Sequence, residues 1–161
     1  MESMTSNQPT TIDESGFAVR RTIRIAAPIE KVWSAVTEPE HISAWFGQTK
    51  LDGKDVGSQG TISWPENRAV PVRIEALDEP RMVAYRWNND DARGQDLERV
   101  DEDHSTVFTF TLEPVPEGTQ LTLVETGFED TSDPAAIVED HRQGWDAELD
   151  KLVALFETGS R

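Results

Sequence analysis

The segment from Ser132 to Phe156 constrains the fold more than any other part of the chain. Its large side chains recur at steps of three and four residues, which places them on one face of a helix. That face consists of Val138, His141, Trp145, Leu149, Leu152 and Phe156. Asp133 suits the N-cap and Pro134 the first helical turn. The helix would run roughly 34 Å, enough to cross a whole small sheet.

The chain before this helix has the patterning and turn signals of a sheet. Strands are predicted at residues 17–26, 48–51, 58–64, 69–77, 81–87, 105–112 and 119–126. Most connections are short, which indicates antiparallel neighbours. Two short helices should follow the first strand, one opened by Pro28 and one by the capping-box spacing of Thr37 and Glu40, ending near Trp45. We therefore expect an α+β fold, in which a curved antiparallel sheet of six to seven strands surrounds the long helix.

The composition restricts the possible partners. A length of 161 residues suits one domain, which we place at 16–161 after a flexible N-terminal tail at 1–15. The formal net charge of −16 disfavours nucleic acid and anionic membranes as partners. The sequence shows no transmembrane run, signal-peptide pattern or cysteine. These features predict a cytoplasmic protein, monomeric or homodimeric, without disulfides or cofactors.

Several local patterns together resemble the helix-grip fold of the START-like (SRPBCC) superfamily, which includes the birch-pollen allergens and polyketide cyclases. The matching residues are 25–33, Thr37-Glu38-Pro39-Glu40 leading to Trp45, Pro80-Arg81 through Tyr85-Arg86-Trp87, Gly127-Phe128, and His141-x-x-Gly144-Trp145 with Leu149 and Leu152. Within this superfamily the chain looks most like homologues of the C-terminal domain of the activator of heat-shock protein 90 ATPase. The resemblance covers about residues 16–157 and implies a cavity between the long helix and the sheet, without implying one activity.

His141 is the polar member of the apolar helix face. It either faces the cavity and hydrogen-bonds a ligand, or it makes a structural hydrogen bond beneath the sheet. Gly144, one turn further on, weakens its helix by about 1 kcal/mol relative to alanine. We expect a strand or loop to approach the helix closely at this glycine.

Arg21 and Glu125 alternate with apolar residues in their strands. In a helix-grip sheet the first and last strands are antiparallel neighbours, so the two charges could pair on the inner face and hold a polar group of a ligand. The alternative is a bulge that turns one of them outward.

Five aromatic or imidazole side chains complete the set of candidates for the cavity. Trp45, Trp87 and Trp145 are expected to converge near one end of the helix, chiefly as core with partial cavity lining. Tyr85 would offer a hydroxyl inside, and His41 could lie at the cavity mouth. No pair of the three histidines has the helical spacing of a metal site, so we expect none.

These residues support three hypotheses about function. The first is binding of a hydrophobic small molecule in a cavity lined by sheet residues, His141 and Trp145. The second is a cyclase- or hydrolase-type enzyme that uses His141, Tyr85 or the Arg21–Glu125 pair for acid–base chemistry. The third is a co-chaperone or interaction protein that binds its partner through the acidic surface.

Overall fold

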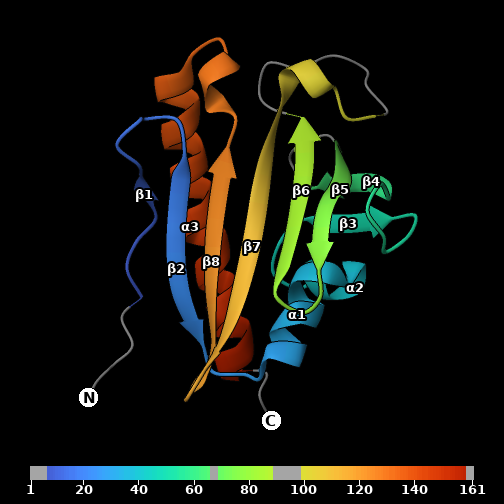
Figure 1. Ribbon diagram of the computed structural model, residues 1–161, viewed down its shortest axis with the longest axis vertical. Helices are drawn as coiled ribbons and strands as arrows, with labels where there is room; N and C mark the ends of the chain where they lie inside the picture. Colours follow the sequence, from blue (N-terminus) through green and yellow to red (C-terminus); the bar gives the residue numbers. More distant parts are fainter. Residues whose placement is uncertain (1–6, 66–68, 89–98, 159–161) are drawn as a thin grey trace.

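The computed structural model describes residues 7–65, 69–88 and 99–158. An antiparallel sheet of eight strands, ordered β1-β2-β8-β7-β6-β5-β4-β3, lies against one long helix (Figure 1). The strands are β1 (Thr11–Ile12), β2 (Val19–Ile25), β3 (Gln48–Leu51), β4 (Gln59–Ser63), β5 (Val70–Asp78), β6 (Met82–Asn88), β7 (Ser105–Val115) and β8 (Gly118–Thr126). The predicted α+β helix-grip fold is confirmed.

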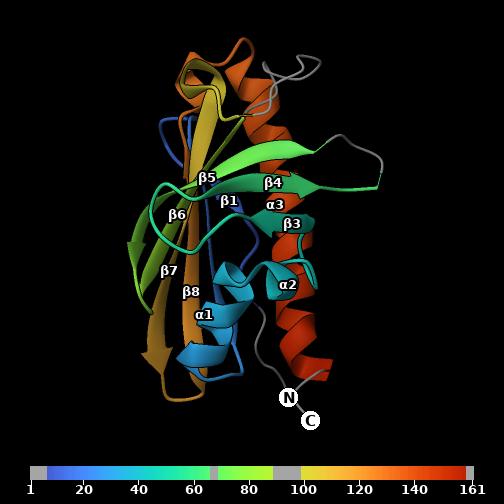
Figure 2. The ribbon, with the colours of Figure 1, turned by 90° about the vertical axis from the view of Figure 1, so that its right-hand side faces the viewer.

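Within the described residues, three α-helices and two short 3-10 helices accompany the sheet. They are α1 (Ile29–Thr37), α2 (Pro39–Ile42), η2 (Glu102–His104), η3 (Phe128–Asp130) and α3 (Pro134–Thr158). Figure 2 shows the sheet curving along one side of α3. Helices α1 and α2 lie on the face of the sheet that is turned toward α3, in the lower part of the view. Among the described residues, no helix has both the length and the apolar character needed to cross a bilayer.

The eighth strand is β1, which lies inside the segment predicted to be a tail. Thr11 pairs with Arg20 and Ile12 with Val19. Residues 1–6 of the predicted tail lie outside the described residues.

Alternation along the central strands builds the core. In β2 every second residue is buried, beginning with Val19, and β8 follows the same rule up to Glu125. The inward residues of β7 are Thr106, Phe108, Phe110 and Leu112. Each large apolar side chain buried in this way contributes about 1.5–3 kcal/mol, and α3 covers them with Val138, Trp145, Leu149 and Leu152.

The predicted start of α3 is confirmed, and the predicted capping of α2 is wrong. Asp133 accepts a hydrogen bond from the backbone N–H of Ala136 at 3.4 Å, which confirms it as a cap of α3. The capping box at Thr37 is wrong, because Thr37 is the last residue of α1 and donates its hydroxyl to the Trp33 carbonyl at 2.7 Å. A hydroxyl bonded back to the preceding turn cannot cap the next helix, and α2 begins at Pro39 without a side-chain cap.

The environment of Gly144 also differs from prediction. The residue is exposed on α3, and a Cβ added there would meet nothing within 4 Å. The expected close approach of a strand or loop is therefore wrong, and nothing in the packing explains a glycine at this position.

We expect Gly144→Ala to raise the free energy of unfolding by about 1 kcal/mol, because alanine favours the helix and the added methyl meets open space. The melting temperature should rise by about 2–4 °C in a calorimetric scan. Gly60→Ala is the opposing control, because its Cβ would collide with the backbone carbonyl of Lys50. A loss of stability in Gly144→Ala would contradict this account.

Candidate functional site

A buried carboxylate lies where α3 crosses the ends of three strands. Glu125 near the end of β8 is 0% exposed, and its neighbours come from β6, β7 and α3. We call Glu125, Trp87, Thr106, His141 and Trp145 the Glu125 cluster. Each strand member occupies an inward position, and His141 and Trp145 lie four residues apart on the inner face of α3.

Each oxygen of this carboxylate has two hydrogen-bonding partners. Oε1 lies 2.9 Å from Nδ1 of His141 and accepts from Nε1 of Trp145 at 2.8 Å. Oε2 accepts from Nε1 of Trp87 at 2.9 Å and from the hydroxyl of Thr106 at 2.5 Å. An ionised carboxylate only accepts, so the imidazole proton belongs on Nδ1. The four partners use the lone pairs of the carboxylate, which leaves no acceptor position for a ligand.

The cluster holds Glu125 in its charged form. Burial by itself would raise the pKa of Glu125, but the charge of His141 and the hydrogen bonds from His141, Thr106 and Trp145 lower the pKa below its ordinary value of 4.5. Hydrogen bonds to a charged group contribute roughly 1.5–3 kcal/mol each. The cluster therefore ties α3 to β6, β7 and β8 and satisfies a charge that would otherwise be costly to bury.

Aromatic rings surround the cluster. The ring of His141 meets Phe128 edge-on with centroids 5.1 Å apart and meets Trp87 in the same way at 6.2 Å. Phe46 stacks on Trp145 with centroids 5.2 Å apart and an interplanar angle of 14°. Of the three tryptophans predicted to converge near one end of α3, Trp87 and Trp145 lie together with centroids 6.1 Å apart, whereas Trp45 stacks on Phe46 at 5.0 Å. Phe46 thus links this region to the α2–β3 connection.

Arg21 does not pair with Glu125. In the register of the sheet Arg21 lies opposite Leu123, while Val19 lies opposite Glu125, so both charges face inward without contact. Arg21 instead donates to the backbone carbonyl of Gln8 at 2.8 Å, to that of Asp146 at 3.0 Å, and to the carboxylate of Asp150 at 2.8 Å.

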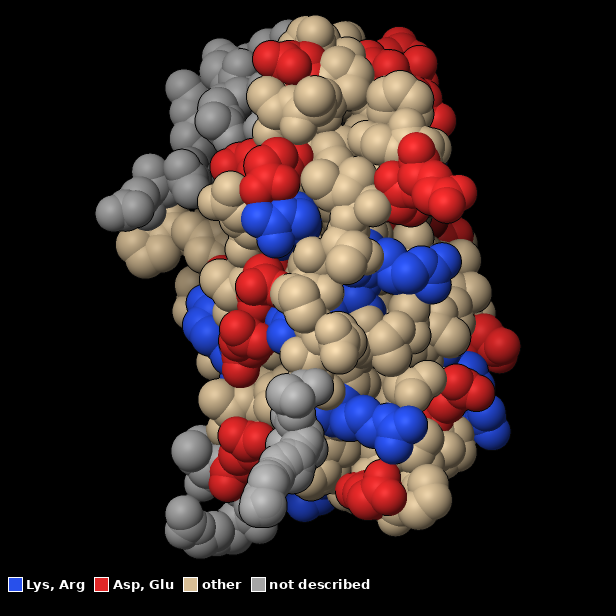
Figure 3. All heavy atoms as spheres, turned by 90° about the vertical axis from the view of Figure 1, so that its left-hand side faces the viewer, with Lys and Arg blue, Asp and Glu red and all other residues tan. Residues whose placement is uncertain are grey.

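Neither alternative for the two charges holds: no bulge turns one of them outward, and no ion pair forms, because α3 supplies acceptors to Arg21 and donors to Glu125. Arg21 thereby joins the N-terminal segment to α3, with its side chain only 4% exposed. Thr10 adds a backbone hydrogen bond to the carboxylate of Asp146 at 2.8 Å. Figure 3, seen from the side of β1 and β2, shows acidic and basic side chains interspersed over this face.

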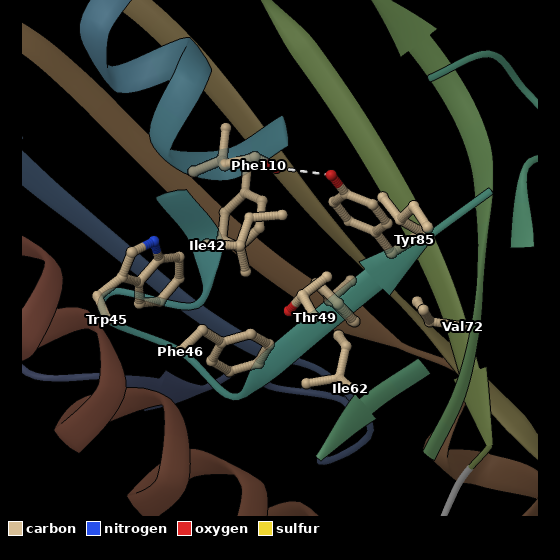
Figure 4. Close-up of a pocket in the computed structure, with 11 residues that line it drawn as sticks. Ile42, Trp45, Phe46, Thr49, Ile62, Val72, Tyr85 and Phe110 are labelled. Atoms are coloured by element: carbon tan, nitrogen blue, oxygen red, sulfur yellow. Dashed lines mark hydrogen bonds between the residues drawn. The ribbon is translucent and has the colours of Figure 1, made fainter. Parts of the chain in front are cut away.

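A small pocket lies beside the aromatic rings, between strands β4 to β7 and the segment formed by α1, α2 and β3 (Figure 4). Its volume is about 10 Å³, close to the space of a single water molecule. It is lined by Val36, Ile42, Trp45, Phe46, Thr49, Leu51, Ile62, Val72, Tyr85, Phe108 and Phe110. None of these side chains is charged at neutral pH.

Six of the eight cavity candidates lie in the pocket or in the Glu125 cluster. Trp45 and Tyr85 line the pocket. His141, Trp145, Trp87 and Glu125 belong to the Glu125 cluster, Arg21 bonds to α3, and His41 is exposed on α2. Contact of any of them with a ligand stays a prediction. Among the described residues, no three histidine, aspartate or glutamate side chains gather as a metal site requires.

Several residues of the site were not found from the sequence. Thr106 shares the inward alternation of Phe108 and Phe110, so the period of two in β7 could have identified it. Phe46 and Thr49 follow α2, where the sequence shows only a change of period. Their place in the pocket depends on how that connection folds back on the sheet.

Comparisons with known proteins agree with this architecture. Protein MLL2253 from Mesorhizobium loti is 29% identical with a TM-score of 0.70, and the alignment covers 88% of this chain and 97% of that chain. CalU16 from Micromonospora echinospora is 22% identical with a TM-score of 0.63, covering 93% and 84%. DynU16, from the dynemicin biosynthetic locus, is 21% identical with a TM-score of 0.69, covering 88% of this chain and 48% of its own. No curated protein matches the sequence.

Because its curved antiparallel sheet packs around one long helix, this chain is a START-like domain. This is a general class of ligand-binding domains. Residues 26–157 match the family described as Activator of Hsp90 ATPase homolog 1-like protein. The chain belongs to that family.

We expect Glu125→Gln to lower the free energy of unfolding by about 2–4 kcal/mol. The amide nitrogen of glutamine is a hydrogen-bond donor, and in place of either carboxylate oxygen it would face two groups that also donate. Urea denaturation followed by tryptophan fluorescence measures this. Glu129→Gln, at an exposed glutamate in η3, is the matched control and should change stability by about 0.5 kcal/mol or less. Equal effects of the two substitutions would show that the hydrogen bonds of Glu125 do not hold α3 against β6, β7 and β8.

The lowered pKa of Glu125 predicts the sign of a pH effect. Ionised Glu125 contributes its full stability above pH 4.5, its ordinary value, and this contribution is lost as the pH falls toward the folded-state pKa. The difference in the free energy of unfolding between the unmodified protein and Glu125→Gln should therefore become smaller as the pH falls below 4.5. Urea titrations of both proteins at pH values on either side of 4.5 give this difference. A difference independent of pH would show that Glu125 is not a charged acceptor.

Proposed function

We propose that the protein binds a hydrophobic small molecule in the pocket between strands β4 to β7 and the α1–α2–β3 segment. The observation that carries this proposal is the uncharged lining of that pocket, in which aromatic and aliphatic side chains from both sides face one another. Apolar walls with a few polar groups are typical of small-molecule sites. The START-like fold adds general support, because domains of this class bind ligands.

This position differs from the one expected from the sequence. Beneath the N-terminal half of α3, the Glu125 cluster and its aromatic neighbours fill the space with bonded side chains. In the proposed function these residues support the site and do not touch the ligand. Phe46 joins the two regions, because it lines the pocket and stacks on Trp145.

A ligand of one ring or more requires the pocket to widen. A dry cavity that accommodates benzene measures on the order of 150 Å³, whereas the pocket holds about 10 Å³. One wall consists of α2 and β3, residues 39–51. Among the described strands, β3 is the last of the sheet and pairs with β4 alone. An outward movement of this wall would therefore leave the central ladders intact.

Titration with toluene, naphthalene and decane tests the proposal. At least one should raise the melting temperature, because a ligand at ten times its Kd stabilises the folded state by about 1.4 kcal/mol. Trp45 lines the pocket, so its fluorescence should change along with stability.

Val72→Ile should abolish the ligand effect, because the added methyl group enters the pocket that Val72 lines. Val83→Ile is the matched control, since Val83 is equally buried on the neighbouring strand but does not line the pocket. Overpacking costs about 1–3 kcal/mol in either variant. A response to no ligand, or a response that Val72→Ile retains in full, would count against this site.

A further inference from the structure

We infer that the pocket accepts only hydrocarbon groups, such as an alkyl chain or an unsubstituted aromatic ring, and excludes hydroxyl, amide and other hydrogen-bonding groups. This inference rests on the proposed function and narrows its class of ligand. The observation that carries it is the surface of the pocket, which is formed by apolar atoms alone. Three of the lining residues, Trp45, Thr49 and Tyr85, carry a side-chain N–H or O–H, and all three direct it elsewhere.

Two of these polar groups are bonded to the end of α1. The indole N–H of Trp45 donates to the Ala35 carbonyl at 2.8 Å. The hydroxyl of Tyr85 donates to the Val36 carbonyl at 2.6 Å, the bond drawn in Figure 4. Both carbonyls belong to the last turn of α1, and the last four carbonyls of a helix have no partner within it. Trp45 and Tyr85 thereby satisfy the buried end of α1 and present only the carbon atoms of their rings to the pocket.

The third polar group is bonded within the wall formed by α2 and β3. The hydroxyl of Thr49 donates to the Gly47 carbonyl at 2.9 Å. The backbone N–H of Thr49 donates to the hydroxyl of Ser43 at 2.9 Å, and that hydroxyl donates to the Pro39 carbonyl at 2.7 Å. These bonds join α2 to β3, so the polar groups of this wall stay satisfied when the wall moves as a unit.

A ligand hydroxyl inside this pocket would lose its hydrogen bonds to water and meet no partner on the apolar surface. If Tyr85 or Trp45 turned its polar group toward the ligand, a carbonyl of α1 would lose its donor instead. In either case one buried polar group is left unsatisfied. The loss in affinity from such a group is roughly 5- to 150-fold.

Toluene and phenol, titrated at pH 7 by calorimetry, test the inference, because a methyl group and a hydroxyl group are similar in size. In the unmodified protein we expect toluene to bind at least about fivefold more tightly than phenol. The hydroxyls of Tyr85 and Thr49 do not face the ligand, so Tyr85→Phe and Thr49→Val should each change the ratio of the two affinities by less than about twofold. Tyr85→Phe should nevertheless lower the melting temperature, because the Val36 carbonyl loses its donor.

Thr109→Val is the matched control, because this hydroxyl lies on an outward position of β7, away from the pocket. It should leave the ratio of the two affinities unchanged. A smaller preference for toluene in the unmodified protein, or a larger change of the ratio in Tyr85→Phe or Thr49→Val, overturns the inference, while binding of toluene leaves the proposed function standing. Absence of binding by toluene, naphthalene and decane refutes the proposed function and the inference with it. If either variant does not fold, the comparison of toluene with phenol in the unmodified protein still decides.

Discussion

The position of α3 depends on how the protein accommodates the charge of Glu125. The carboxylate is fully buried, and an isolated charge in such a place would cost several kcal/mol. Its partners come from α3, β6 and β7, so the charge is satisfied only when these elements are assembled together. A second tie at Arg21 fastens the same helix to β2 and the N-terminal segment. The helix is thus held at specific points as well as by its apolar face.

This way of holding α3 determines where the pocket can be. Indole and imidazole rings that might have lined a cavity under α3 instead point their N–H groups at Glu125 and pack against Phe46, Phe108 and Phe128. The space that remains lies on the other side of Phe46, against α2 and the edge strand β3. In the proposed function α3 therefore keeps its contacts while the pocket widens, because the wall that moves, α2 and β3, makes none of the hydrogen bonds to Glu125.

Residue patterns predicted the elements well and their polar contacts poorly. Inward positions of Arg21 and Glu125 follow from the period of two, but their partners depend on a register that places Arg21 opposite Leu123. The predicted meeting of three tryptophans is found for Trp87 and Trp145 alone, since Trp45 packs on Phe46 instead. Thr37 was predicted to cap α2, yet it remains within α1, since a hydroxyl chooses between two local acceptors that a sequence does not rank.

The sequence by itself determined the class of fold, because hydrophobic periods of 2 and 3.6 residues define which faces must be buried, and only a few layer arrangements bury them. It also indicated that His141 needs a hydrogen-bonding partner, either a ligand or a group of the protein. Only the tertiary structure decided that this partner is Glu125, and that the remaining space lies beside α2 and β3. Hydrogen-bond partners and empty volume depend on how side chains from distant segments meet to within a fraction of an ångström, and no local pattern carries that information.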